Sequence, residues 1–151
     1  MDYLIVKFLH VGAMFVATAL AVGPMAILVL ILRTGEEATI LRAFGFAGSL
    51  SRAGGISYGL GVVFGITTAL IGGIALTSGW LLTAYAVLLL LIVNNLYADR
   101  WMKQVHVAAS NSNGDRLQRW RRSATPLWSL GGAIVLTLAL VFVMVVKPTL
   151  F

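Results

Sequence analysis

Two polar side chains interrupt an apolar N-terminal segment. In LIVKFLHVGAMF, residues 4–15, Lys7 and His10 stand three apart, which places both on one face of a helix. A lysine near the end of a membrane helix can extend its ammonium group to the lipid headgroups. A histidine is too short to do so, and it needs a partner inside the protein. His10 is therefore the first candidate for chemistry in this chain.

Three roles for the His10 imidazole remain open from the sequence. The neutral ring can donate a hydrogen bond to a backbone carbonyl or to a Ser or Thr across the bundle. It can ligate haem b as an axial metal ligand, which needs a flat space between helices and either a second ligand or an open site. It can also contact a quinone or another ligand.

A cofactor site at His10 would use residues from both ends of the chain. Met144 lies in VFVMVVKP, near the membrane surface that His10 also approaches, and it is the candidate second haem ligand. Lys147 would meet a propionate, and Lys7 completes the candidate cofactor-binding set. His106 lies beyond the third apolar segment, so it cannot share a metal with His10.

The elements that must position these residues are transmembrane helices. Apolar residues make up 60% of the 151 residues and charged residues 11%, and the mean hydropathy is +0.96, whereas soluble domains are about 45–50% apolar and about 25% charged. A helix needs about 20 apolar residues to cross a bilayer. Residues 3–32, 55–78, 81–98 and 127–146 satisfy this, so we expect one all-α domain, 1–151, that is a four-transmembrane-helix bundle.

Charge predicts the orientation of this bundle. Nine of the 11 basic residues lie in the segments 33–54 and 99–126, which the positive-inside rule makes cytoplasmic loops. Both termini then lie on the non-cytoplasmic side. The net charge of +6 reflects this orientation, and nucleic acid is not an expected partner. TGEE, residues 34–37, fits a capping box before a short interfacial helix, and Trp101, Trp120 and Trp128 would mark the inner interface.

Small residues form a stripe along the second span. Gly61, Gly65, Ala69 and Gly72 extend a GxxxG pattern, which permits close approach of another surface. The stripe is a candidate packing interface for a neighbouring helix of the same bundle, for a second copy or another membrane subunit, or for a flat ring such as a porphyrin or carotenoid.

Other polar residues favour structural roles. Asn94 and Asn95 fall in the third span, where amides connect helices by hydrogen bonds, and Asp99 and Lys103 have the spacing of a surface ion pair. No Asp or Glu lies inside a predicted span, no cysteine is present, and P-loop and dinucleotide-binding motifs are absent. The sequence therefore does not predict an enzyme.

Short motifs carry a resemblance to known families. KFLHVGAMFVATALAVGP with a terminal VFVMVVKP resembles the domain-of-unknown-function family numbered 2269, bacterial four-helix integral membrane proteins. More distantly, the Lys-x-x-His opening is similar to the copper-resistance D family and to the membrane protoporphyrinogen oxidase family. The latter resemblance implies haem binding through a histidine of the first helix, and His10 alone maps onto that ligand.

Three functions are compatible with these observations. The first expectation is an accessory or assembly subunit of a larger bacterial inner-membrane complex, without catalytic residues, that contacts membrane lipids and either other subunits or a second copy through its second helix. The alternative is a haem-binding redox protein or oxidase that uses His10. The second alternative is a small-molecule or metal transporter, with a polar path drawn from this set: Thr18, Tyr58, Thr67, Thr68, Asn94, Asn95 and Thr137.

Overall fold

Five helices make up almost all of the described chain. The computed structural model describes residues 2–147. The helices are α1 (Asp2–Thr34), α2 (Glu37–Ile71), α3 (Gly79–Ser110), α4 (Gly114–Arg122) and α5 (Thr125–Val146). All except α4 are long and apolar enough to cross a membrane. The expected all-α architecture with four long apolar helices is confirmed, and it indicates a multi-pass membrane protein.

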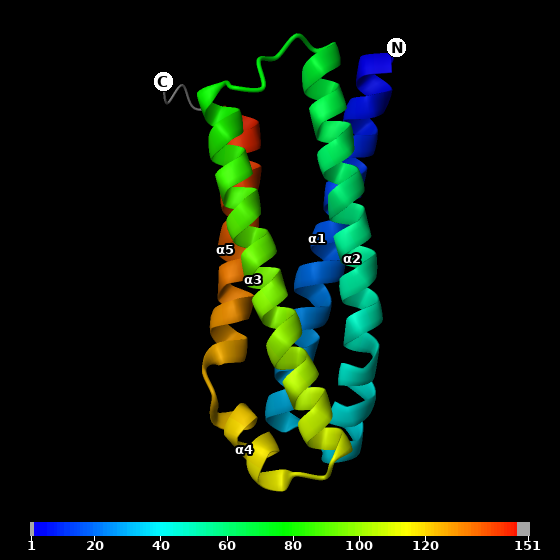
Figure 1. The fold of residues 1–151 in the computed structure, drawn as a ribbon, viewed down its shortest axis with the longest axis vertical. Helices are drawn as coiled ribbons and strands as arrows, with labels where there is room; N and C mark the ends of the chain where they lie inside the picture. Colours follow the sequence, from blue (N-terminus) through cyan, green and yellow to red (C-terminus); the bar gives the residue numbers. More distant parts are fainter. Residues whose placement is uncertain (1, 148–151) are drawn as a thin grey trace.

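The bundle is antiparallel, with its basic segments at one end. Figure 1 shows α1 beginning and α5 ending at the same end of the molecule, where residues 72–78 also connect α2 to α3. The opposite end carries the α1–α2 turn and α4. We call this opposite end the basic end, because the arginines of segments 33–54 and 99–126 belong to it.

The two segments expected as loops are mostly helical. Helix α2 begins at Glu37 rather than at residue 55 and ends at Ile71 rather than at residue 78, while α3 continues to Ser110 instead of ending near residue 98. Only short connections separate the helices at the basic end. At a rise of about 1.5 Å per residue, α2 is roughly 50 Å long, so α2 and α3 must extend well past a hydrocarbon core about 30 Å thick.

The main core cluster of the bundle continues into the basic end, which explains why these helices extend beyond the expected spans. Trp101 is 2% exposed, and its ring contacts Phe44 edge-on, with centroids 6.0 Å apart, and Trp120 at 6.5 Å. Ile40 and Val105 are fully buried in the same cluster. Trp101 is thus a core residue instead of the expected interface marker, whereas Trp128 is 79% exposed. Burial of these large side chains stabilises helical turns that hydropathy alone does not predict.

Two connections depend on glycine. The turn between α1 and α2 consists of Gly35 and Glu36, and a Cβ at Gly35 would lie only 2.7 Å from the Ile31 carbonyl oxygen. Gly73 has φ +65 in the segment that ends α2, a conformation that side chains disfavour. The expected capping box does not form, because Thr34 Oγ1 donates to the Leu30 carbonyl and the N-cap residue Glu36 makes no side-chain hydrogen bond.

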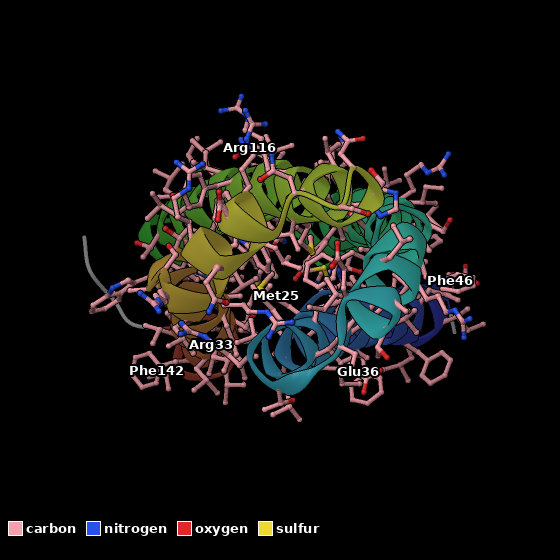
Figure 2. The ribbon with its side chains drawn as sticks, turned by 90° about the horizontal axis from the view of Figure 1, so that it is seen from below. Met25, Arg33, Glu36, Phe46, Arg116 and Phe142 are labelled. Atoms are coloured by element: carbon pink, nitrogen blue, oxygen red, sulfur yellow. The ribbon has the colours of Figure 1, made fainter. Side chains whose placement is uncertain are left out.

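Helix α4 closes the basic end through two crossed contacts. Arg33, at the end of α1, donates to the Ser123 carbonyl at 2.6 Å, and Arg121 of α4 donates to the Gly35 carbonyl at 2.6 Å. Asn113 caps α4 by accepting from the Arg116 amide. Viewed from this end, Figure 2 shows Met25 inside the bundle, while Arg116 and Phe142 point away from it.

Candidate functional site

His10 connects α1 to α2. Its Nδ1 atom lies 2.7 Å from the Gly61 carbonyl oxygen. A carbonyl only accepts, so Nδ1 carries a proton and donates. This is the hydrogen-bonded arrangement that the sequence allows for a neutral imidazole inside a bundle.

The glycine stripe of α2 packs against α1 of the same chain. A Cβ at Gly61 would lie 2.5 Å from Met14 Sδ, and one at Gly65 would lie 2.8 Å from His10 Cε1. At the far end of the stripe, Tyr3 would be 3.0 Å from a Cβ at Gly72. Ala69 is buried. Of the three occupants that the sequence permits, α1 is the one seen here, so self-association through α2 would need another face of that helix.

The other candidate cofactor residues have separate surroundings. Met144 is half-buried and packs against Ala84, Leu140 and Val143, between α3 and α5. Lys147 places its Nζ 5.5 Å from the centre of the Trp80 ring, and Lys7 places its Nζ 5.8 Å from that of Tyr3. Each ammonium thus lies over an aromatic ring, a favourable electrostatic contact.

The contacts of His10 leave no room for a porphyrin between α1 and α2. Its imidazole lies against the α2 backbone at Gly65, which leaves no flat space between α1 and α2. A cavity between α1, α2 and α3 is lined by neither His10 nor Met144. In the described part of the chain, residues 2–147, no group of three or more His, Cys, Asp or Glu side chains gathers to hold a metal ion.

The two adjacent asparagines have different surroundings. Asn94 Nδ2 donates to the Ser129 carbonyl of α5 at 3.0 Å, and its Oδ1 would lie 3.0 Å from a Cβ at Gly132. Asn94 therefore connects α3 to α5, as expected. Asn95 faces another direction, and its Oδ1 is buried without a hydrogen-bond partner.

Three hydroxyls of the expected polar path meet at the bundle centre. The Tyr58 hydroxyl faces the side chains of Thr18 and Thr137 from α1 and α5. The Tyr58 hydroxyl forms no well-aligned hydrogen bond with them, and Thr137 Oγ1 is equally unpartnered. Thr67 and Thr68 instead donate to carbonyls of their own helix. The polar residues are thus divided among helix contacts, and they do not line one continuous path.

A cavity of about 520 Å³ lies between α1, α2 and α3. Its wall on α1 is apolar and includes Leu20, Pro24 and Met25. The α2 wall includes Gly55 and Gly59, where an added Cβ would meet nothing within 4 Å. The volume falls within the roughly 300–1,000 Å³ typical of ligand pockets.

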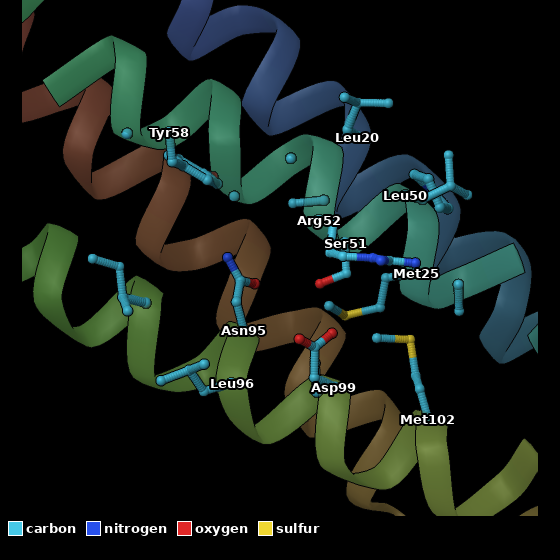
Figure 3. A pocket seen from close by; sticks show the side chains of 18 of the residues that line it. Leu20, Met25, Leu50, Ser51, Arg52, Tyr58, Asn95, Leu96, Asp99 and Met102 are labelled. Carbon is cyan, nitrogen blue, oxygen red and sulfur yellow. The ribbon is translucent and has the colours of Figure 1, made fainter. Parts of the chain in front are cut away.

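Polar groups gather at one end of this cavity. Figure 3 shows Asn95 and Asp99 pointing from α3 toward α2, with Ser51 and Arg52 on the opposite wall. Among residues 2–147, Asp99 forms no ion pair, and the expected pair with Lys103 is absent. Arg52 Nε donates to the Gly48 carbonyl within its own helix at 3.2 Å.

The sequence did not predict this cavity, although the spacing of its lining residues indicates two helix faces that could form it. Asn95 and Asp99 are four residues apart, as are Ser51, Gly55 and Gly59. Such spacing aligns side chains on one helix face. The two faces belong to helices that hydropathy treats as independent, so their pairing becomes visible only in the fold.

Comparison with known proteins gives no assignment. No family model, curated protein or solved structure matches this chain.

Proposed function

We propose that the chain is an accessory subunit of a larger bacterial inner-membrane complex, without catalytic residues of its own, and that its basic end docks an acidic segment of a partner subunit. The segments 33–54 and 99–126 face the cytoplasm in this proposal, as the positive-inside rule favours.

The observation that carries the proposal is a basic hollow at the basic end, formed mainly by α3 and α4. This hollow, about 610 Å³, is lined by Lys103 and Gln104 of α3, by Arg116, Arg119 and Trp120 of α4, and by neighbouring residues, none of them acidic. Lys103, Arg116 and Arg119 are exposed. Positive charge at a docking face steers an acidic partner and selects against basic ones.

Helix α4 supports docking because it is held in place. The two crossed contacts of Arg33 and Arg121 attach α4 to the α1–α2 turn, and Leu117 anchors α4 in the core with 4% exposure. A surface held in its bound geometry loses little conformational entropy when a partner binds. Orientation in the membrane needs positive charge but does not need such a fixed arrangement.

The interior polar groups are consistent with a non-catalytic role. His10 and Asn94, the side chains best suited to chemistry within the spans, donate to backbone carbonyls of neighbouring helices. Interhelical hydrogen bonds of this kind contribute about 0.6 kcal/mol on average. Their roles in this fold are connections between helices.

The test is affinity purification of the native protein in mild detergent, with and without charge removal in the hollow. We expect partner chains to co-purify with wild type at low salt, to dissociate near 1 M salt, where the screening length falls to about 3 Å, and to be lost from the Arg116→Gln/Arg119→Gln double variant.

The matched control removes two other exposed arginines. The Arg42→Gln/Arg100→Gln variant has the same net charge as the test variant, but neither residue lines the hollow. It should keep the partner. Equal retention or equal loss in the two variants would contradict docking at the hollow, and a solitary, fully functional monomer would contradict the accessory role itself.

A further inference from the structure

The cavity between α1, α2 and α3 extends from the apolar part of the predicted spans to their ends near the membrane surface. Its apolar lining, including Leu20, Leu88 and Ile92, belongs to the predicted spans, whereas Arg52 and Asp99 lie just beyond the ends of those spans. Asn94 is level with Ser129, to which it donates. Helices α3 and α5 are antiparallel. Asp99 lies five residues beyond Asn94, about 7.5 Å along the axis of α3, and is therefore level with the start of α5. The polar end of the cavity is therefore at headgroup depth.

The cavity is open at the side of the bundle, between α2 and α3. Gly55 and Gly59 of α2 and Leu96 of α3 line it and are themselves exposed. The two glycines leave the α2 backbone without side chains along this wall, and an added Cβ at either would touch nothing. A flexible hydrocarbon chain could enter sideways between α2 and α3 without moving either helix.

Unsatisfied polar groups point to an occupant with a polar head. The Tyr58 side chain is 8% exposed and lines the cavity, while its hydroxyl faces Thr18 and Thr137. Asn95 Oδ1, also on the wall, is buried and unpartnered. Pro24 has no amide hydrogen, so the Leu20 carbonyl lacks its helical donor on the α1 wall. Buried polar atoms in such positions usually have a partner.

The charges at the rim select the kind of head. Arg52 stands on α2 and Asp99 on α3, on opposite walls, and they form no ion pair with each other (Figure 3). One positive and one negative group, held apart at headgroup depth, complement a head that carries both an anionic phosphodiester and an ammonium group.

From this arrangement, we infer that the cavity is a binding site for a zwitterionic glycerophospholipid, with its phosphate at Arg52, its ammonium at Asp99 and Asn95, and one acyl chain along the glycine wall. A glycerol-headed anionic lipid would satisfy Arg52 alone. The site is independent of the basic hollow, which lies on α4 and the outer side of α3.

The experiment uses the full chain in nanodiscs of equal parts phosphatidylethanolamine and phosphatidylglycerol, followed by extraction into detergent and native mass spectrometry. We expect one phosphatidylethanolamine retained per chain. Removal of one charge-assisted contact typically weakens binding about tenfold, so Asp99→Asn should lose most of the preference for phosphatidylethanolamine, and Arg52→Gln should weaken retention of both lipids.

A cavity-filling variant distinguishes this site from lipid bound generally around the protein. Gly59→Leu places a side chain in the cavity without a backbone clash and should abolish retention while the helical content is kept. Gly12→Leu is the matched control, since Gly12 also has open space around it but does not line the cavity.

Two outcomes would overturn the inference. These are equal retention in Gly59→Leu and Gly12→Leu, or a preference for phosphatidylglycerol in wild type. Loss of partner chains in the Arg116→Gln/Arg119→Gln variant does not bear on this result, because lipid retention is measured on the isolated chain.

Discussion

The His10 Nδ1 atom donates to the Gly61 carbonyl oxygen across 2.7 Å, and the same imidazole lies over Gly65 one helical turn away. One side chain of α1 thus makes a hydrogen bond to α2 and depends on the absence of a side chain there. Substitution of His10 removes both the hydrogen bond and the packing, whereas substitution of Gly65 disturbs the packing. The two contributions can therefore be measured separately.

The glycines under α1 should respond differently to alanine. A methyl group at Gly65 meets the His10 ring at 2.8 Å, whereas one at Gly61 meets Met14 Sδ at 2.5 Å. Methionine adjusts readily because its side chain is flexible, but the ring is fixed by its hydrogen bond. We expect Gly65→Ala to lower the free energy of unfolding by about 1–3 kcal/mol and Gly61→Ala to change it less, as measured by thermal denaturation in detergent.

Truncation of the His10 side chain should relieve its clash with an alanine at position 65. In the double variant His10→Ala/Gly65→Ala, part of the Gly65→Ala cost should be recovered, which a double-mutant cycle measures as coupling. Gly12→Ala is the control, because nothing lies within 4 Å of its Cβ position. Strict additivity of the two substitutions would show that His10 and Gly65 do not pack as described.

Absorption spectroscopy tests the haem alternative for His10. Since the His10 ring is packed against α2 through Gly61 and Gly65, we expect no Soret band that depends on this residue when the protein is purified from haem-supplied cells. A band in wild type that disappears in His10→Ala would restore the haem-binding function.

Substitution of the neighbouring asparagines by leucine should separate their roles. Asn94→Leu removes the donor to the Ser129 carbonyl and adds bulk where Gly132 allows close approach. We expect a loss of about 1–3 kcal/mol in unfolding free energy. Asn95→Leu removes an unpartnered buried atom, so its effect on the lipid-free protein should be small or stabilising. The opposite ranking would contradict these assignments.

The crossed arginine contacts should control the mobility of α4. Arg121→Ala removes the donor to the Gly35 carbonyl, and hydrogen bonds from charged groups contribute about 1.5–3 kcal/mol. Amide hydrogen exchange should therefore become faster across residues 111–123. Arg122→Ala, an exposed neighbour without such a contact, is the control. Equal exchange in the two variants would mean that Arg121 does not hold α4 in place.

Membrane orientation can be mapped by single cysteines, because the natural chain has none. A membrane-impermeant maleimide applied to intact spheroplasts should label Thr77→Cys in the α2–α3 connection and leave Ser112→Cys at the basic end unlabelled until the membrane is opened. The reverse pattern would place the basic end outside and remove the basis of the cytoplasmic docking proposal.

The sequence predicts the membrane environment, the number of long helices and the gathering of arginines into two segments, because transfer free energy and charge belong to individual residues and sum along the chain. It also predicts that His10 needs a partner and that the α2 stripe must be packed. It does not predict the continuation of α2 and α3 outside the bilayer, since that depends on burial of Trp101 and Phe44 against each other.

Only the tertiary structure decides which partner each group meets. Asn94 and Asn95 are identical in type and adjacent, yet one connects two helices and the other lines a cavity, because successive helical residues point about 100° apart. His10 meets Gly61, and Asp99 shares a cavity with Arg52, through the register and rotation of whole helices against one another. Those quantities arise from packing over the entire interface, which no local pattern of residues contains.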